Sequence, residues 1–327
     1  MVTGAGFVVI ASLALGACGQ FATLQARKSW KEANTFYRQQ NYVRAAELYE
    51  EVIEKGSAGG ELQDELKAAY FFLANSYDNL YRPGRVGEPE NDALLTRAVE
   101  NYTLASERIP DNEGIGPDSP LRGMKMLSLQ YLVAAYGPDK LNDPSQAEPV
   151  LIKMIEMNPT EPQNYFQLGK LYEDAGAYDA AEEMYVKAAE VRPNDSSVYT
   201  QLAAYYNRQG EFDKTMEALY ERAEREPNNP EAHYIIANYY WDKVFRDFRL
   251  EDPEKKDFIA KGLESIDKAI ALKDDYVDAL IYRGLLLRLE ANMETNRARQ
   301  QALISEAEEL QARAKELQQL QVSGVGN

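Results

Sequence analysis

The stretch YFQLGKLYEDAGAYDAAEEMYVKAAEVRP, residues 165–193, consists of two amphipathic segments joined by a glycine-containing turn. A small residue such as Gly169 lets two paired helices approach closely, whereas Tyr172 and Tyr185 are large enough to fill the space between neighbouring pairs. Pro193 has no backbone N–H to donate, so it ends a helix or starts the next one. The stretch therefore predicts a pair of packed helices.

The same pattern returns about every 34 residues. Its small and large positions recur at Tyr199, Leu202, Ala203, Tyr206, Gly210, Phe212 and Pro227, and again at His233, Ile236, Ala237 and Tyr240. This pattern resembles the tetratricopeptide repeat, and it continues more loosely toward the N-terminus. The resemblance implies an all-α, right-handed α-solenoid over residues 26–290, made of six repeats and part of a seventh. Neighbouring pairs in such a fold stack because no pair can bury its apolar face alone.

Two segments rich in charge, residues 80–91 and 243–257, lengthen the connections inside the second and sixth repeats. We expect both to be exposed insertions. Long ordered loops in compact proteins are often functional, and simple sequence drift is the alternative explanation.

Residues 291–327 are expected to form a C-terminal helix followed by a frayed tail. The helix carries an apolar stripe with helical spacing, made of Ile304, Ala307, Leu310, Ala314 and Leu317. Solenoids need a terminal element that covers their last repeat, so we interpret this segment as a capping helix. The alternative is a docking helix for a partner or for a second copy of the chain.

Cys18 is the only cysteine, and it follows an apolar run that closes with the small residues Gly16 and Ala17. Such a run is typical of a secretory signal, and with the cysteine it resembles the lipobox of bacterial lipoproteins. The resemblance implies that residues 1–17 are a signal peptide, that the Cys18 thiol is acylated, and that residues 18–25 form a short tether. The protein would then be attached to a membrane by its first mature residue.

The leader departs from the usual signal pattern because residues 1–17 contain no Lys or Arg. An uncleaved membrane anchor and a buried apolar N-terminus therefore remain as alternatives, although the segment is shorter than the ~20 residues that span a bilayer. Gly19 stands where an Asp would favour retention in the inner membrane. We therefore expect an outer-membrane location in the bacterial cell envelope, facing the periplasm.

The net charge of −17 disfavours binding to nucleic acid, because that binding depends on Lys and Arg at phosphates. It also disfavours peripheral binding to anionic lipid. His233 is the only histidine. With the single cysteine assigned to lipid, no zinc site and no Cys–His centre can form. We expect no enzymatic activity, no cofactor and no metal site.

In the tetratricopeptide family, partners contact inward-facing positions of the first helix of each repeat. The resemblance assigns these positions to Trp30, Asn34, Phe166, Lys170, Asn207, Arg208, Tyr234, Asn238 and Trp241. Trp, Tyr and Arg are the commonest binding hot spots, and an Asn amide can both donate to and accept from a peptide backbone. The alternative is that the aromatic residues among them pack against an insertion or the C-terminal helix.

One subgroup of the family captures C-terminal carboxylates with a Lys–Asn clamp. Asn34 matches one clamp position, but Trp30 replaces the clamp lysine. Capture of chaperone tails is therefore not expected.

Together these features predict a lipid-anchored envelope scaffold or adaptor that binds a protein or peptide partner on its concave face. The alternative is a structural protein that self-associates through its C-terminal helix and has no groove ligand. A weaker third hypothesis is an enzyme subunit or a carbohydrate-binding surface. The sequence leaves the partner and the oligomeric state open.

Overall fold

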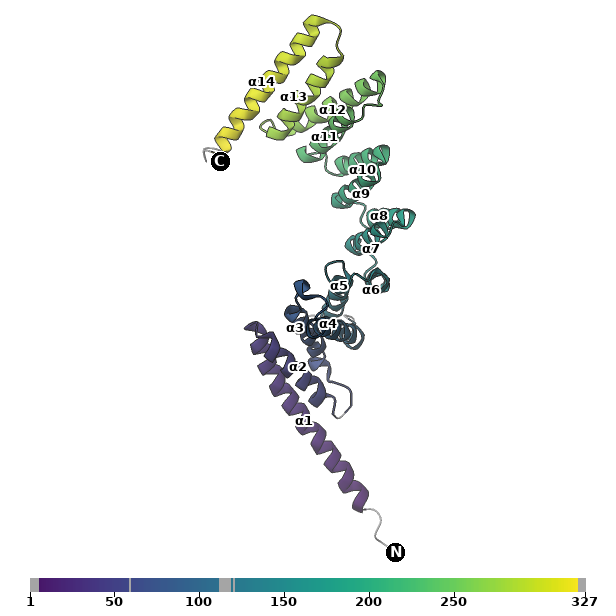
Figure 1. Ribbon diagram of the computed structural model, residues 1–327, viewed down its shortest axis with the longest axis vertical. Helices are drawn as coiled ribbons and strands as arrows, with labels where there is room; N and C mark the ends of the chain where they lie inside the picture. Colours follow the sequence, from purple (N-terminus) through teal and green to yellow (C-terminus); the bar gives the residue numbers. More distant parts are fainter. Residues whose placement is uncertain (1–5, 59, 112–118, 120, 323–327) are drawn as a thin grey trace. The chain divides into compact units, whose positions relative to one another are not determined.

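The computed structural model describes residues 6–58, 60–111, 119 and 121–322, with side chains from residue 21 onward. Over these residues the chain forms α-helices, two short 3-10 helices and turns, and it contains no strand. It divides into two compact units, Met1–Pro159 (unit 1) and Thr160–Asn327 (unit 2). In each unit consecutive helices pack as hairpins (Figure 1). The predicted all-α solenoid of helical pairs is thereby confirmed.

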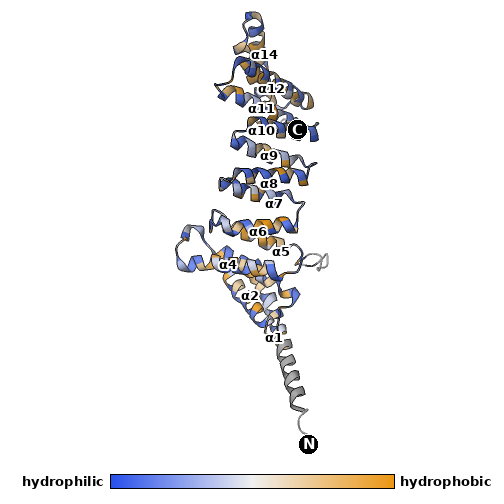
Figure 2. Ribbon diagram, turned by 90° about the vertical axis from the view of Figure 1, so that its right-hand side faces the viewer, coloured by the Kyte–Doolittle hydropathy of each residue, from blue (hydrophilic) through white to orange (hydrophobic). Residues whose placement is uncertain are grey.

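Unit 1 consists of consecutive hairpins, with α3 packed on α2 and α5 packed on α4. The helices are α1 (Gly6–Arg38), α2 (Tyr42–Gly56), α3 (Ala68–Leu80), α4 (Pro89–Arg108), α5 (Met124–Tyr136) and α6 (Pro144–Met157). The 3-10 helices η1 (Asp64–Leu66) and η2 (Pro83–Arg85) lie in the connections. Colouring by hydropathy shows much of α5 and α6 as hydrophobic (Figure 2). Burial of such surface between helices is the main stabilising contribution in a fold of this kind.

Unit 2 continues in the same way from α7 to α14. Its helices are α7 (Pro162–Asp174), α8 (Tyr178–Val191), α9 (Ser196–Gln209), α10 (Phe212–Arg225), α11 (Pro230–Arg246), α12 (Asp252–Leu272), α13 (Val277–Met293) and α14 (Arg297–Val322). The first helices of two neighbouring pairs, α11 and α13, also contact each other. Residues of these two first helices therefore lie side by side.

Local sequence explains where these helices begin and end. The Asp195 carboxylate accepts a hydrogen bond from the Ser197 amide (3.0 Å), and the Asn229 side chain accepts one from the Glu231 amide (3.0 Å). Each bond satisfies an N–H group that the first helical turn leaves without a partner. Gly210 ends α9 in the left-handed region, with φ +76°, where a side chain would be strained. The repeat spacing predicted from the sequence follows from these turns.

The α3–α4 connection, residues 81–88, is mostly exposed but is fixed by hydrogen bonds to the first turn of α4. The Asn91 amide group donates to the carbonyls of Arg82 and Arg85 (both 3.1 Å), and its oxygen accepts from the Arg82 N–H (2.8 Å). Asn91 is buried, whereas residues 82–90 are exposed. One side chain at the start of α4 therefore holds the loop in a single conformation.

The segment at residues 243–257 differs from the expected loop, because most of it is helical. α11 continues to Arg246 and α12 begins at Asp252, so only residues 247–251 connect them. Glu251 and Glu254 form a capping box, with Pro253 in the first turn, and this arrangement starts α12 early. The extra residues therefore lengthen a hairpin.

The C-terminal helix α14 packs against α13 along the predicted stripe. Ala307 and Ala314 are buried, and Leu310 and Leu317 are half-buried against the cluster formed by Val277, Leu280 and Ala314. A Cβ atom placed on Gly284 would lie 3.3 Å from the Ala307 carbonyl oxygen, which shows how closely the two helices approach. The stripe is thus occupied within the chain, as expected of a capping helix.

The predicted signal segment and the lipidation site lie at the edge of what the structure describes. Residues 1–5 are outside the described part, and so are the side chains up to residue 20, including that of Cys18. Among the described residues, no helix has an apolar stretch long enough to cross a bilayer. Acylation of Cys18 therefore stays a prediction.

Candidate partner-binding surfaces

Two of the predicted inward-facing residues, Trp30 and Asn34, meet at one shallow depression on α1. This depression has a volume of about 480 Å³ and is lined by Trp30, Lys31, Asn34, Thr35, Tyr37, Arg38 and Phe72. The Phe72 ring, from α3, lies edge-on to Trp30 (5.8 Å between centroids) and to Tyr37 (5.1 Å). Phe72 was not among the site residues predicted from the sequence. We call Trp30, Tyr37 and Phe72 the α1 aromatic frame.

Tyr49 of α2 forms the floor beneath this frame. It is fully buried, its ring stacks on Phe72 (5.8 Å), and its hydroxyl donates to Asn34 Oδ1 (3.0 Å). Burial raises the pKa of Tyr49. Asn34 Nδ2 in turn donates to the Trp30 carbonyl (2.8 Å). The Asn34 amide therefore fixes residues of its own chain, and only part of its hydrogen-bonding capacity is left for a peptide.

The fourth repeat departs from the expectation at Phe166. Its side chain is only 9% exposed and packs on Tyr185 of α8 (5.8 Å between centroids). The Phe166 side chain therefore lies in the interior of its own hairpin, between α7 and α8. We correct its assignment from a groove residue to a packing residue.

Charged groups on the inner faces of α7 and α9 neutralise one another. Arg208 Nε and Nη2 donate to the two carboxylate oxygens of Glu173 at 2.8 and 2.9 Å, and the Tyr185 hydroxyl donates to the same carboxylate at 3.2 Å. The Glu173 side chain is 8% exposed. Lys170 pairs with Asp174 at 2.5 Å. Lys170 and Arg208 thus have intramolecular partners, whereas Asn207 is exposed.

We expect Arg208→Met to destabilise unit 2 by about 1–2 kcal/mol, because it leaves the buried Glu173 carboxylate without its main partner. The effect is below that of a fully buried pair, since the Arg208 side chain is 43% exposed. Adding Glu173→Gln should recover part of the loss, because the double variant has no unpaired charge. Urea denaturation of the two single variants and the double variant measures the coupling.

The same pair predicts a pH dependence. The hydrogen bond from Arg208 lowers the pKa of Glu173 below its ordinary value of 4.5. A lowered pKa in the folded state gives stability that is present above pH 4.5 and is lost as the pH falls through the folded pKa. The difference in stability between wild type and Arg208→Met should therefore shrink below pH 4.5. A constant difference down to the acid transition would contradict this assignment.

The sixth repeat carries a second aromatic frame, formed by Tyr234 and Trp241 of α11 and Tyr282 of α13. The Tyr282 ring lies edge-on to Tyr234 (5.4 Å) and to Trp241 (5.3 Å). Trp241 also stacks on Phe245 (4.9 Å, 11° between ring planes), which is 56% exposed. Asn238 is half-buried, and its amide makes no hydrogen bond to any residue that the structure describes. We call Tyr234, Trp241 and Tyr282 the α11 aromatic frame.

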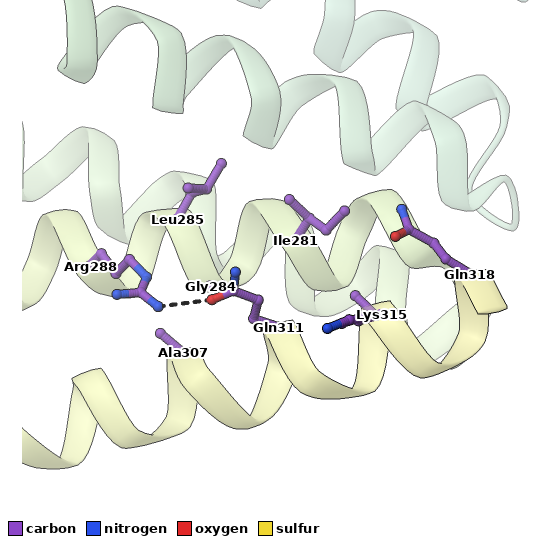
Figure 3. Close-up of a pocket in the computed structure, with 9 residues that line it drawn as sticks. Ile281, Gly284, Leu285, Arg288, Ala307, Gln311, Lys315 and Gln318 are labelled. Carbon is purple, nitrogen blue, oxygen red and sulfur yellow. Dashed lines mark hydrogen bonds between the residues drawn. The ribbon is translucent and has the colours of Figure 1, made fainter.

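A larger hollow of about 740 Å³ lies between α13 and α14, at positions of the degenerate last repeat that the sequence analysis did not assign. Figure 3 shows the hollow, in which Arg288 Nη2 donates to Gln311 Oε1 (3.2 Å). It is lined by Ile281, Gly284, Leu285, Arg288, Ala307, Gln311, Ala314, Lys315 and Gln318. The capping helix therefore supplies one wall of a concave surface.

No group of three or more His, Cys, Asp or Glu side chains among the described residues is arranged to hold a metal ion. The concave surfaces are lined by aromatic, amide and charged side chains. Such side chains are suited to non-covalent recognition.

Residues 140–205 match the tetratricopeptide repeat family. The matched segment includes all of α6, α7 and α8 and most of α9. Over this segment, the match agrees with the helical hairpins that the structure shows. Comparison with curated proteins gave no match by sequence.

Comparison with solved structures also gave matches, one of them with a TM-score above 0.5. The chain is similar to the C-terminal part of a TPR repeat-containing protein from Cytophaga hutchinsonii, with 16% identity, a TM-score of 0.53, and coverage of 88% of this chain and 98% of that one. It also matches MamA from Desulfovibrio magneticus, with 17% identity, a TM-score of 0.39 and coverage of 59% and 94%. A third match is YrrB, described as a TPR protein with an unusual peptide-binding site, with 18% identity, a TM-score of 0.36 and coverage of 60% and 83%.

Proposed function

We propose that this protein is a scaffold or adaptor of a bacterial cell envelope, held at the membrane by a lipid on Cys18, that binds partner proteins through the inner faces of its tetratricopeptide helices. The observation that carries the proposal is the recurrence of one arrangement, an aromatic–x3–Asn–x2–aromatic series on a first helix completed by an aromatic ring from the next repeat. It occurs at Trp30, Asn34 and Tyr37 with Phe72, and again on α11.

Both frames are half-buried, so each offers an apolar surface to a ligand without being part of the closed core. Half-buried aromatic rings beside polar groups are the usual composition of protein-binding hot spots. Asn238 adds an amide that can donate to and accept from a peptide backbone. We propose no cofactor and no catalytic activity for these surfaces.

The proposed location follows from the sequence alone. Cys18 after small residues supports lipid attachment, and Gly19 supports the outer membrane, facing the periplasm. Attachment would confine the binding surfaces to a plane and raise their effective concentration for partners in the same membrane.

The test is affinity capture from detergent-solubilised envelopes with the wild type and with Asn238→Ala/Trp241→Ala. Truncating a hot spot costs about 2 kcal/mol or more, equivalent to about 30-fold in affinity, so a partner held by the wild type should be lost by the double variant. Circular dichroism and hydrogen exchange would establish that the variant is folded. Phe248→Ala is the matched control, since this aromatic residue is 90% exposed in the α11–α12 connection.

Each alternative predicts a different pattern of capture. Loss with Phe248→Ala alone would move the site to the α11–α12 connection. Equal capture by all three proteins would remove the α11 aromatic frame from the proposal. A captured partner that is not a protein would contradict the proposed class of ligand.

A further inference from the structure

The two aromatic frames have similar ring arrangements but differ in the charge of the residues that flank them. On α1 the frame is flanked by Lys31 and Arg38, both exposed and both lining the depression. On α11 the corresponding positions are Ile235 and Asp242. Asp242 is paired with Arg246 at 2.6 Å. The α1 surface therefore differs from its counterpart mainly in its two cations.

Among the residues that the structure describes, these cations have no neutralising partner. No carboxylate lines the depression, and neither Lys31 nor Arg38 forms an ion pair with any residue that the structure describes. The chain has 53 Asp and Glu residues against 36 Lys and Arg, so carboxylates are abundant elsewhere. Two unpaired cations beside an apolar surface attract a ligand that carries negative charge next to an apolar group.

We propose that the α1 depression binds an acidic segment of a partner protein, with carboxylates at Lys31 and Arg38 and an apolar side chain on the α1 aromatic frame. This inference rests on the proposed function and names the chemistry of its ligand. The net charge of −17 opposes approach to anionic lipid, which favours a peptide over a membrane surface as the occupant.

The spacing of the two cations along α1 predicts the sequence motif of the acidic ligand. Lys31 and Arg38 are seven residues apart on one helix, which at ~1.5 Å per residue is about 10 Å. A peptide in the polyproline II conformation rises ~3.1 Å per residue and returns to the same face every third residue, so two carboxylates three residues apart are separated by about 9 Å. The expected ligand thus has Asp or Glu at i and i+3, with an aromatic or aliphatic residue between them.

The experiment is selection from a random nine-residue peptide library displayed on phage, with the full-length chain in detergent micelles as the target. Three proteins are compared: wild type, Lys31→Glu/Arg38→Glu, and Lys28→Glu/Arg44→Glu. The last is matched in charge change and lies in the same unit, but its two cations already pair with Glu32 and Glu47. Binding of the enriched peptides is then measured by fluorescence anisotropy.

Wild type and the matched control should enrich acidic peptides with the expected spacing, and Lys31→Glu/Arg38→Glu should bind them at least about tenfold more weakly, as expected for loss of charge-assisted contacts. Enrichment of neutral or basic peptides, or equal binding by all three proteins, would overturn the acidic assignment while leaving peptide binding intact. No enrichment by any protein would contradict peptide binding at this site altogether.

A vesicle-binding assay distinguishes an anionic membrane from an acidic peptide as the ligand of the two cations. All three proteins are tested for binding to phosphatidylglycerol vesicles. If Lys31→Glu/Arg38→Glu weakened vesicle binding more than the matched control did, and peptide selection were unchanged, the cations would serve the membrane and the proposal would be wrong.

Discussion

Tyr49→Ala should destabilise unit 1 by about 3–5 kcal/mol, the usual loss when a buried aromatic residue is truncated. Tyr49 is fully buried, stacks on Phe72 and lies 5.6 Å from Trp30. Removing the ring leaves a cavity beneath the α1 aromatic frame. The free-energy cost of that cavity adds to the transfer free energy lost with the side chain. The binding depression should be lost together with the stability.

The measurement uses the tryptophans as reporters. The chain has two, Trp30 and Trp241, so a Trp241→Phe background leaves Trp30 as the only tryptophan signal. Urea denaturation followed by Trp30 fluorescence then reports on the first repeat. Tyr49→Phe is the control, because it removes only the bond to Asn34 and should cost about 1 kcal/mol.

Hydrogen exchange tests how far the effect extends. Repeats in a solenoid contact only their neighbours. Amides of α9 and α10 should therefore exchange at wild-type rates in Tyr49→Ala, whereas those of α1 and α2 should exchange faster. Equal stability of Tyr49→Ala and Tyr49→Phe would show that the ring stack contributes little.

Cys18→Ser should abolish lipid attachment completely, because no other thiol exists in the chain to accept the diacylglycerol. We expect an unprocessed precursor that incorporates no fatty acid. An alkyne-labelled fatty acid detects the modification, and intact mass gives the cleavage site. A single acyl chain binds a membrane only marginally, so loss of all acylation should also release the mature chain if it is cleaved by another route.

The control relocates the thiol. Ser12→Cys/Cys18→Ser carries one cysteine inside the apolar run, and it should remain unlabelled if the small residues before Cys18 specify the site. Fatty-acid labelling of Cys18→Ser would contradict the lipobox assignment, and the alternatives of an uncleaved anchor or a buried N-terminus would then stand.

The sequence was sufficient to predict the helical pairs. They depend on local spacing: a turn glycine such as Gly210, caps such as Asp195, and small residues where helices touch. Trp30 and Asn34, which the sequence assigned to inward-facing positions, line one depression, since residues four apart on a helix share a face.

Only the tertiary structure determined the features that depend on packing between neighbouring repeats. Phe166 occupies an inward-facing position by spacing, yet its hairpin buries it against Tyr185. Arg208 is bound to Glu173 from the preceding repeat, and Phe72 from the following repeat completes the α1 aromatic frame. Periodicity specifies which face of a helix a residue occupies, but helix rotation and the distance between repeats come from packing of residues far apart in the chain. For that reason only the three-dimensional structure shows that Lys31 and Arg38, on which the acidic ligand is inferred, have no ion-pair partner in the described part of the chain.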